Sequence, residues 1–494
     1  MFVPNYPTEG LTGAEYNPRK ITPECEADLR QSISEVGFVK PILVTEAGRI
    51  VAGHQRTNAA RLLGMTTVPA YIIKSLELVH EMVFNQLHNG ADIDEGDPQV
   101  RIPPSTAEGF QDVPPEGIDG AFKQPGAAMR NEIYRLICRY GNWGAVVATQ
   151  SGEVLSSHQY ALACKQAARP LRVFFVPEEK RPAVLRWFTK QYGVFCYDRL
   201  PKQTYLQAHA QPSRNKKGEG STDGEADEIQ SATYDLIRPT LRKTERLLDF
   251  GCGFGQILAE LQRGGFRALG VEFFYKGNSH SIKPHAVHQM VEDVCTDLER
   301  NGLFDIVVCD SVINSVDSVA AENNVLACLN AFCRRGGRII FSGRSKRDFA
   351  KASSYYRSSA AQTDFQLLDE DGFSALPRGG QWLFQKYHSK VEAFALATRT
   401  IGPAAKLIYQ PGRWQAHGQK TIELSADVCR AAIAAEFDLP WPEGRRVGKA
   451  ERALRAWDTA RAKDRNAELV VSAPRKEEAE PSVSAGQGRD VEAP

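Results

Sequence analysis

The residues of this chain best suited to chemistry surround a run of glycines in its second half. The segment LLDFGCGFGQ, residues 247 to 256, predicts a strand that ends in a tight turn and continues into a helix. Gly251 and Gly253 remove side chains where a ligand has to approach the backbone, and Gly255 permits close helix packing. Asp249 lies in front of the turn, where an acid attracts a cation and repels a phosphate.

Further acids follow the next predicted strands. Glu272 lies at the carboxyl end of the strand predicted in FRALGVEFF, 23 residues after Asp249. This position is suited to binding a ribose diol. Asp293 follows a short predicted third strand within MVEDVCTD. A fourth strand, predicted within FDIVVCDSVIN, ends at Asp310. Dinucleotide sites use G-x-G-x-x-G, whereas this chain has D-x-G-x-G-x-G. The spacing therefore favours a cationic cofactor over NAD.

This succession resembles class I S-adenosylmethionine-dependent methyltransferases over roughly residues 232–390. The resemblance implies a Rossmann-like α/β sheet in which the glycine turn holds the methionine part of the cofactor. It also implies that Asp249 orients the ammonium side of the pocket, that Glu272 binds the ribose hydroxyls, and that Asp293 or Val294 contacts the adenine. A fifth strand is expected at 338–342 and a closing antiparallel strand at 379–389.

The methyl acceptor is less clearly marked. The Asp/Asn-Pro-Pro-aromatic motif with which amino-methylating DNA enzymes hold a flipped base is replaced here by DSVIN. Cys309 lacks the preceding proline expected of a nucleophile for cytosine methylation. Asp310 and Asn314 are the candidate catalytic residues, which would hydrogen-bond the acceptor. Basic residues within 333–348 predict phosphate contacts near the carboxyl edge of the sheet, and a solvated basic face is the alternative.

The first two hundred residues contain an internal repeat. Sliding the chain by 104 positions places GFVKPILVTEAGRIVAGHQRTNAA (37–60) over GNWGAVVATQSGEVLSSHQYALAC (141–164), with identical residues at six positions and matching apolar ones. Both copies predict a strand, a glycine turn, a second strand and a helix that starts at a His-Gln pair. In the first copy, Gly53 begins a helix whose N-terminus suits an anion, and Arg56 is positioned to clamp phosphate oxygens.

The first copy resembles the ParB/sulfiredoxin-like fold of plasmid and chromosome partition proteins. The resemblance covers about 90 residues and runs in order through the following blocks: Asn17-Pro18-Arg19, ITPECEADLRQSISEVGFVKPILV, Gly53-His54-Gln55-Arg56, GMTTVPAYII and FNQLHN. It implies a nucleotide-phosphate pocket or DNA-linked scaffold at residues 53–56, with a nucleoside triphosphate as the candidate ligand. Versions with Gly-His-x-Arg often accompany methyltransferases in phages and plasmids.

Two departures from the ParB pattern argue against nucleotide hydrolysis and leave binding open. Gln55 replaces the first arginine of Gly-Glu-Arg-Arg, and Phe84 replaces an acid. In the second copy Ser157 and Tyr160 stand where Gly53 and Arg56 stand in the first. The second copy is therefore interpreted as a degenerate, structural repeat.

Composition places these segments in a soluble, multidomain protein. The 494 residues are 42% hydrophobic and 24% charged, with a net charge of +1, no apolar run long enough to span a membrane and no signal-peptide pattern at the start, so a cytoplasmic location is expected. Cysteines such as Cys138, Cys309 and Cys328 are expected to be reduced and buried, and no metal site is predicted.

The predicted fold class is α/β, a Rossmann-like class I methyltransferase sheet preceded by two small α+β ParB-like modules. The expected segments are a ParB/sulfiredoxin-like domain at 1–90, a linker at 91–128, a degenerate repeat at 129–200, a linker at 201–228, a methyltransferase domain at 229–440, and a helical segment with a disordered tail at 441–494.

Three functions remain open. In the first, a methyltransferase of phage or plasmid origin acts on DNA or a nucleobase and uses the N-terminal module to bind DNA or nucleotide. In the second, the acceptor is a small molecule or protein and the N-terminal half is regulatory. In the third, the cofactor site is a binding module without transfer. The basic cluster favours the first, the missing Pro-Pro-aromatic motif favours the second, and the intact glycine turn argues against the third.

Overall fold

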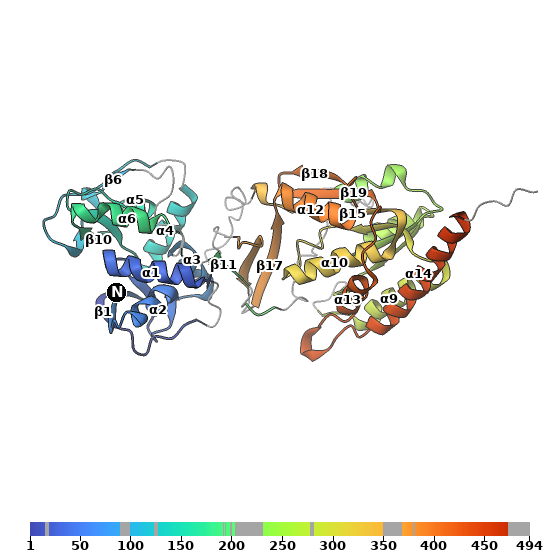
Figure 1. The fold of residues 1–494 in the computed structure, drawn as a ribbon, viewed down its shortest axis with the longest axis horizontal. Coiled ribbons are helices and arrows are strands. Elements are labelled where there is room, and N and C mark those ends of the chain that lie inside the picture. Colours follow the sequence, from blue (N-terminus) through green and yellow to red (C-terminus); the bar gives the residue numbers. More distant parts are fainter. Residues whose placement is uncertain are drawn as a thin grey trace, which may run out of the picture.

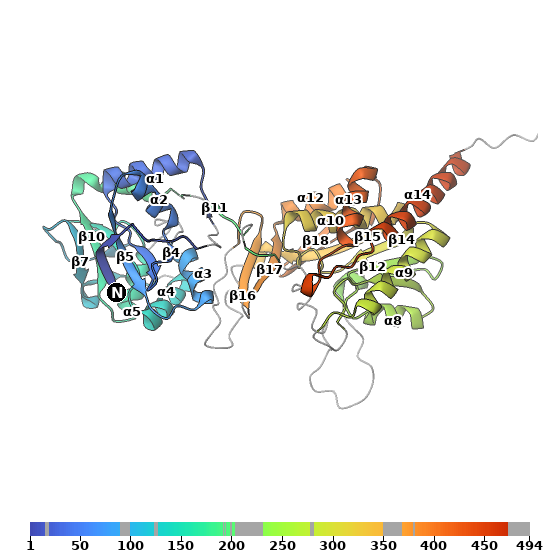
Figure 2. The ribbon, with the colours of Figure 1, turned by 90° about the horizontal axis from the view of Figure 1, so that it is seen from below.

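The molecule is elongated, with two lobes that meet at a narrow middle region (Figures 1 and 2). The computed structural model describes residues 1–14, 19–88, 99–122, 127–190, 192, 194–197, 200–202, 231–276, 281–348, 368–378 and 381–472. The N-terminal lobe contains both copies of the repeat and the second lobe contains the glycine turn. The expected α/β architecture, with two small α+β modules before a Rossmann-like sheet, is confirmed.

The first module packs α1, α2 and α3 around a sheet with the strand order β1-β5-β3-β4. Its helix α1 is well specified by sequence, because Thr22 caps it by accepting from the Cys25 N–H at 3.3 Å, a proline opens it, and Gly37 ends it at φ 97. The elements are β1 (Phe2–Pro7), β2 (Arg19–Lys20), α1 (Pro23–Val36), β3 (Ile42–Thr45), β4 (Ile50–Ala52), α2 (His54–Leu62), β5 (Thr67–Ile73) and α3 (Leu78–His88).

The second module repeats this plan. Its sheet has the order β7-β10-β9, and α4, β9 and α5 begin and end 104 residues after α1, β3 and α2, so the repeat is confirmed. The elements are β6 (Val100–Arg101), β7 (Gly109–Val113), β8 (Asp119–Gly120), α4 (Ala127–Tyr140), β9 (Val146–Thr149), α5 (His158–Gln166), β10 (Leu171–Val176), α6 (Arg181–Phe188) and β11 (Val194–Phe195).

The expected linker at 91–128 is therefore wrong over residues 99–122. Strand β7 pairs antiparallel with β10, as β1 pairs with β5, so this segment supplies the first strand of the second module. Its backbone hydrogen bonds are satisfied by strand β10, about 60 residues later, rather than by water. Residues 91–98, and 203–230 of the second expected linker, lie outside the described residues.

The two modules share one hydrophobic core. Phe84 of α3 is fully buried, with its ring centroid 5.2 Å from Trp143 and 5.6 Å from Tyr140 of the second module. An acid at this position would lose its hydration without gaining a cation. The departure of Phe84 from the ParB pattern therefore serves the contact between the two copies.

The second lobe is built on a sheet with the order β13-β12-β14-β15, all parallel, continued by the antiparallel strands β19 and β18. The chain order reverses between β12 and β14, which is where open α/β sheets bind ligands. The elements are α7 (Ala232–Asp235), β12 (Arg246–Phe250), α8 (Gln256–Arg263), β13 (Arg267–Val271), α9 (Pro284–Asn301), β14 (Phe304–Cys309), α10 (Val319–Phe332), β15 (Cys333–Ser345), β16 (Phe373–Arg378), β17 (Gln381–His388), α12 (Lys390–Thr400), β18 (Lys406–Gln410), β19 (Arg413–Gln419), α13 (Ala426–Glu436) and α14 (Ala450–Ser472).

Two strand predictions in this lobe are wrong. The expected third strand at MVEDVCTD is part of helix α9, because Val287, Val291, Val294 and Leu298 recur at helical spacing and face the core. Within the segment 379–389, residues Gln381–His388 form β17, which runs parallel to the end of β15, while β19 supplies the antiparallel strand beside β15. The β16–β17 hairpin lies between the two lobes, and Tyr197, in the connection between them, is buried in the core of the second lobe (Figures 1 and 2).

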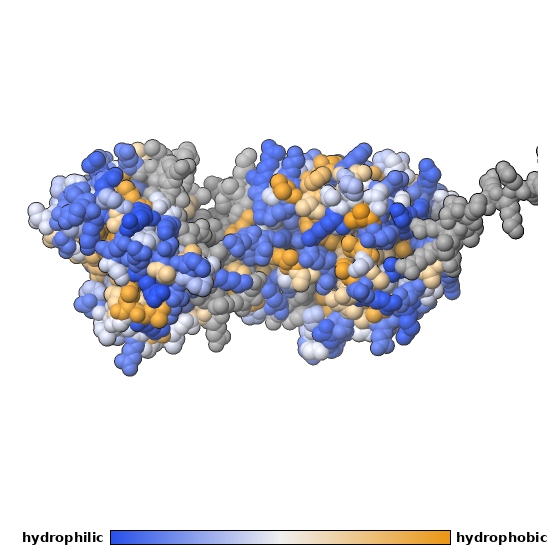
Figure 3. All heavy atoms as spheres, viewed as in Figure 1, coloured by the Kyte–Doolittle hydropathy of each residue, from blue (hydrophilic) through white to orange (hydrophobic). Residues whose placement is uncertain are grey.

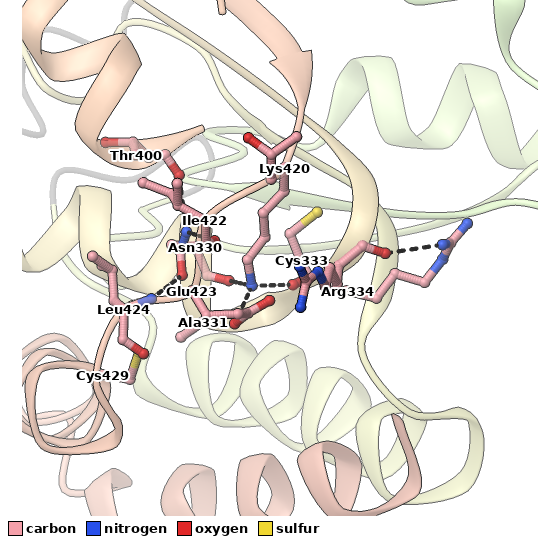
Figure 4. A network of polar contacts seen from close by, with 12 residues as sticks. Asn330, Ala331, Cys333, Arg334, Thr400, Lys420, Ile422, Glu423, Leu424 and Cys429 are labelled. Atoms are coloured by element: carbon pink, nitrogen blue, oxygen red, sulfur yellow. Dashed lines mark hydrogen bonds and ion pairs between the residues drawn. The ribbon is translucent and has the colours of Figure 1, made fainter. Parts of the chain in front are cut away.

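Helices α13 and α14 add a further layer outside α9 and α10 (Figure 1). The segment that leads from β19 to α13 is fastened to α10 by buried polar contacts of Lys420 (Figure 4). Its ammonium donates to the carbonyls of Asn330 and Cys333, at 2.7 and 2.8 Å, at the end of α10 where a cation is favoured. Helix α14 continues to Ser472, so disorder from about residue 462 is wrong up to that point, and 473–494 lie outside the described residues.

The visible face in Figure 3 is mainly hydrophilic with scattered hydrophobic patches. Among the described residues, no helix combines the length and hydrophobicity needed to cross a membrane. Cys309 and Cys328 are buried thiols as expected, whereas Cys138 is exposed on α4.

Candidate active site and nucleotide pocket

The glycine turn after β12 is partly open and partly packed. All three glycines have positive φ, of 87°, 59° and 70° for Gly251, Gly253 and Gly255. A Cβ added at Gly251 would lie 2.3 Å from a methyl carbon of Val312, so this glycine is required by packing. A Cβ at Gly253 or Gly255 would meet nothing within 4 Å. The turn therefore leaves a cradle over its second and third glycines.

Glu272 faces this cradle. Its carboxylate, 5% exposed, accepts from the Gly253 N–H at 3.1 Å and from the Phe274 N–H at 3.0 Å. The end of β13 is also tied to the turn, since the Val271 carbonyl accepts from the N–H groups of Gly251 and Cys252. The expected proximity of Glu272 to the glycine turn is thus present.

Asp249 is almost completely buried at the end of β12. It accepts from the Tyr234 hydroxyl at 2.6 Å, which ties helix α7 to the edge of the sheet. Tyr234 itself is fully buried. Asp249 therefore carries both a charge beside the turn and an anchor for the segment that precedes the sheet.

Asp310, a predicted catalytic residue, is surrounded by hydroxyl groups. It accepts from four side chains, listed with their distances as Ser231 (2.7 Å), Thr233 (2.9 Å), Ser311 (3.2 Å) and Ser342 (2.7 Å). Ser231 is also the N-cap of α7. The geometry indicates that Asp310 organises α7 and the loop after β14.

Asn314 differs from Asp310. Its side chain is 5% exposed, its Nδ2 donates only to the Ser315 hydroxyl at 3.3 Å, and its Oδ1 has no hydrogen-bond partner among the described residues. The loop that carries it is strained, since Ser311 has φ 62 and Val312 reaches over Gly251. A buried amide oxygen without a donor is costly unless a ligand supplies one.

Asp293 and Val294, the predicted adenine contacts, do not lie at the end of a strand as expected. Asp293 is exposed on α9 and accepts from Gln289 of the same helix at 2.9 Å, and Val294 packs in the core. Neither follows a strand, because the third strand expected there is helical. Among the described residues, no strand lies beyond β13 on that side of the sheet.

The basic cluster of 333–348 is divided. Arg334 lies at the amino end of β15, whereas Arg347 follows its carboxyl end. Arg334 pairs with Asp305 at 2.7 Å and Arg338 with Glu245 at 3.0 Å, both at the amino half of the strand. Only the part from Arg344 onward lies at the carboxyl end, near the glycine turn side of the sheet. The expected single basic patch is therefore wrong.

The first module contains a pocket at the turn predicted to bind phosphate. It is lined by Leu29, Ser32, Ile33, Gly37, Phe38, Val39, Lys40, Gly53, His54, Gln55, Arg56, His88, Trp187, Phe188, Lys190 and Tyr192. The structure thus brings together all the predicted residues 53–56. Gly53 has φ 100, and a Cβ there would lie 2.6 Å from Ile42, so no other residue fits this turn.

The two histidines of the pocket are neutral. Burial lowers the pKa of His54 to about 4, and its Nε2 accepts from the Ala14 N–H at 3.0 Å. Burial, followed by the nearby Arg56, holds the pKa of His88 well below its usual value. His88 Nδ1 lies 2.7 Å from Arg56 Nη2, which makes Nδ1 the acceptor and leaves the proton on Nε2. That Nε2 has no hydrogen-bond partner among the described residues, so the pocket contains a buried donor.

Arg56 has a different setting from the one predicted. Its guanidinium donates to the Lys40 carbonyl at 2.6 Å and to the Pro41 carbonyl at 3.4 Å, besides its contact with His88. It therefore holds the loop before β3 in place as well as lining the pocket.

Comparison with known proteins agrees with the two lobes. A family model described as "ParB N-terminal domain" matches residues 3–86, and one described as "Methyltransferase domain" matches 225–387. The ParB-like nuclease domain-containing protein YnaK of Escherichia coli is 37% identical over 70 residues, which span 14% of this chain and 80% of that protein. The chain belongs to the ParB-domain family. It joins this ParB domain to a methyltransferase domain.

Other relatives cover smaller parts of the chain or match it less closely. The probable chromosome 1-partitioning protein ParB of Deinococcus radiodurans is 43% identical over 68 residues, 13% of this chain and 24% of that protein. A solved SAM-dependent methyltransferase from Methanosarcina mazei is 15% identical, with 38% of this chain and 99% of that chain covered and a TM-score of 0.26. A solved, truncated ParB from Caulobacter crescentus, complexed with CTP-gamma-S, is 32% identical, with 19% and 55% covered and a TM-score of 0.18.

The repeat of the ParB domain in the second module has lost the pocket. Tyr160, the counterpart of Arg56, is 4% exposed, and its hydroxyl accepts from the N–H groups of Trp143 and Gly144 at 3.0 and 2.8 Å. The Trp143 and Tyr160 rings are 4.9 Å apart. The aromatic pair fills the space that the first module leaves open, which agrees with a structural repeat.

Some residues of both sites escape sequence reasoning. Tyr234, Ser231 and Thr233 come from a short helix before the sheet, and only the spacing of a capping serine marks it. His88 lies in the ParB-like block FNQLHN without a sign of its contact with Arg56. Four further lining residues lie more than 130 residues after Gly53, and no local signal indicates their contact with the pocket: Trp187, Phe188, Lys190 and Tyr192.

Proposed function

We propose that the methyltransferase domain is S-adenosylmethionine-dependent and acts on DNA or a nucleobase, in a phage or plasmid context. The observation that carries the proposal is the open cradle at Gly253 and Gly255, flanked by the buried carboxylates of Asp249 and Glu272. S-adenosylmethionine supplies an electrophilic methyl group on a cationic sulfonium, and its ammonium is also cationic. Buried carboxylates attract such a ligand and repel a pyrophosphate.

Different residues of the cradle bind different parts of the cofactor. Glu272, fixed to the turn by two N–H groups, accepts hydrogen bonds from the ribose hydroxyls. Asp249 orients the ammonium side, and Tyr234 fixes its carboxylate by a 2.6 Å hydrogen bond. Because these groups are held before the cofactor arrives, little ordering is needed on binding.

Asn314 is the proposed acceptor-binding residue. Its Oδ1 accepts a hydrogen bond from an amine of the substrate, which holds the nitrogen lone pair toward the methyl group. An exocyclic base amine has the required donor, and a base has to leave the helical stack to reach a buried amide. Arg344 and Arg347, exposed at the carboxyl end of β15, supply phosphate contacts. Asp310 positions this loop rather than moving a proton.

Cofactor binding is tested by filling the cradle. Gly253→Leu places a side chain in open space, and we expect at least a tenfold loss of S-adenosylmethionine affinity by calorimetry. Gly265→Leu is the matched control, since Gly265, which follows α8, has φ 79 and a Cβ there would meet only the flexible Lys243 side chain among the described residues. Equal affinity in the two variants would refute the cradle as the cofactor site.

The acceptor is tested with radiolabelled cofactor and separate fractions of phage DNA, host DNA, nucleosides and cell extract. Label in DNA or nucleosides, lost in Asn314→Ala, supports the proposal. Label only in small molecules or proteins supports the alternative, a methyltransferase with a regulatory ParB domain, which the absence of a Pro-Pro-aromatic loop favours. No label from protein that binds cofactor would leave a binding module.

We further propose that the ParB domain binds a nucleoside triphosphate in the pocket at residues 53–56. The supporting observation is the buried His88 Nε2 donor beside the N-terminus of α2, with Lys40 and Arg56 adding positive charge. Arg56→Gln is expected to weaken nucleotide binding at least tenfold. Arg61→Gln is the control, because Arg61 also lies on α2 and binds the carbonyls of Thr8 and Leu11 at 2.8 Å but does not line the pocket.

A further inference from the structure

The pocket of the first module is completed by the second. Twelve of its lining residues belong to the first module. The other four belong to the second module: Trp187 and Phe188 at the end of α6, and Lys190 and Tyr192 just after it. The two sets differ in chemistry. The first module supplies the glycine turn, Lys40, Arg56 and the His88 donor, which suit phosphate oxygens. The second supplies three aromatic rings and one ammonium, which suit a nucleobase.

We propose that the end of α6 in the second module forms the base-binding wall of the nucleotide pocket in the first, with Phe188 and Lys190 as the contact residues. The inference rests on the proposed binding of a nucleoside triphosphate. It assigns a role to the degenerate repeat, whose own pocket is filled by Tyr160.

This wall is fixed to the first module by polar contacts with α1. Glu35 accepts from the Trp187 indole N–H at 2.8 Å and also pairs with Arg186. The Trp187 hydrogen bond is the largest of the effects that lower the pKa of Glu35. Lys190 pairs with Asp28 at 2.6 Å, and its ammonium lies 4.6 Å from the centroid of the Trp187 ring. The base-binding wall therefore has a defined position before ligand binds.

Packing below the wall supports the same conclusion. Trp187 belongs to a core shared by Val36 and Val39 of the first module and by Val147, Leu155, Val176 and Val184 of the second. Phe188 is only partly buried, and Lys190 is exposed. Trp187 thus anchors the wall, while the next residues remain accessible to a ligand.

The ligand chemistry follows from this division. Phe188 offers a ring face for stacking, which every base can use, and stacking on an aromatic side chain typically changes affinity by about tenfold or more. The Lys190 ammonium donates to a base carbonyl oxygen, so bases that carry an exposed carbonyl are favoured over adenine. The wall therefore contributes both affinity and a preference among bases. The phosphate end contributes affinity but no preference among bases.

The experiment compares the full chain and its variants in binding the four ribonucleoside triphosphates and inorganic tripolyphosphate, which has no base. Wild type is expected to bind its preferred nucleotide about tenfold or more tightly than tripolyphosphate. Phe188→Ala should remove that advantage and leave tripolyphosphate affinity unchanged, and Lys190→Met should reduce the preference among bases. Leu185→Ala, on α6 but outside the pocket lining, controls for packing of the helix.

The outcomes separate the two proposals. Wild type that binds neither nucleotide nor tripolyphosphate overturns nucleotide binding itself, and the wall with it. Wild type that binds nucleotides, with Phe188→Ala and Lys190→Met unchanged in affinity and base preference, overturns the wall alone. Loss of tripolyphosphate binding in Phe188→Ala would also overturn it, because the variant would then have acted on the phosphate end or on folding.

Discussion

The two copies of the N-terminal repeat begin their equivalent helices in the same way, yet they differ in the side chain that follows, and the pocket described above lies at the first copy. Helix α2 starts after Gly53, at φ 100, and helix α5 starts after Ser157, at φ 55. Both of these residues have the left-handed backbone conformation, and neither helix has a side-chain cap. One turn further on, Arg56 holds backbone carbonyls beside the pocket, whereas Tyr160 fills the equivalent space. A strand, a left-handed turn and a helix therefore provide a position for a ligand, and the side chain one turn later decides whether it is open.

The methyltransferase domain extends the comparison. Helix α8 starts after Gly255, at φ 70 and again without a side-chain cap, and its turn leaves space over two glycines. The two open turns differ in charge, since acids flank the turn at Gly255 and cations flank the turn at Gly53. The same local geometry thus suits a cationic cofactor in one lobe and an anionic ligand in the other.

The largest expected effect comes from removing the left-handed glycine of the first copy. Gly53→Ala adds a Cβ 2.6 Å from Ile42 in a backbone conformation that disfavours it. We expect a loss of about 2–4 kcal/mol in unfolding free energy, from strain and overpacking together. Ser157→Ala, which adds no Cβ, should cost less than about 1 kcal/mol. Equal losses by urea denaturation would show that the copies do not differ at this turn.

Acid should weaken the first copy through His54. Its folded pKa is lowered to about 4 by burial, against 6.5 when exposed, so the unfolded chain binds the proton first as pH falls. The stability contributed by the neutral ring is complete above pH 6.5 and is lost between about 6.5 and 4. We expect the difference in unfolding free energy between wild type and His54→Gln to shrink by about 3 kcal/mol across this range. A constant difference would contradict the buried, neutral state of His54.

Strand-end chemistry is the part of this fold that sequence predicts well. The bounds of β12 and the position of Glu272 follow from short buried strands that end in glycine or acid, because a parallel strand is apolar on both faces. The repeat is also predictable, since its spacing of 104 residues is uninterrupted. By contrast, the short segment MVEDVCTD predicts a strand, although its valines, Val291 and Val294, are three residues apart. The longer window from Val287 to Leu298 shows that this spacing is helical.

Contacts between distant segments could not be predicted. The edge strand β7 is short and flanked by prolines, so its sequence indicates a loop until its partner β10 is known. The hydroxyl groups around Asp310 come from three separate segments, and no local sequence pattern indicates that they meet there. The base-binding wall depends on α6 meeting α1, and neither helix carries a local sign of it.

A smaller effect is expected from the residue that fills the second copy. Tyr160→Phe keeps the ring but leaves the buried N–H groups of Trp143 and Gly144 without their shared acceptor. We expect a loss of about 1–3 kcal/mol in unfolding free energy. Tyr140→Phe is the control, because it removes one partly buried hydrogen bond to His80 and should cost about 1 kcal/mol or less. No loss in Tyr160→Phe would mean that shape alone closes this pocket.

The smallest effect concerns the left-handed residue of the second copy itself. Ser157→Gly relieves a conformation that costs a non-glycine residue about 1 kcal/mol, but it also adds backbone freedom to the unfolded chain, which costs a similar amount. The two terms oppose each other, so we expect a change in unfolding free energy of less than about 1 kcal/mol in either direction. The pocket should also remain closed, because Tyr160 and not Ser157 fills it. If Ser157→Gly alone created nucleotide binding in a chain that carries Arg56→Gln, the turn rather than the side chain after it would decide which copy binds, and the difference between the copies would need another explanation.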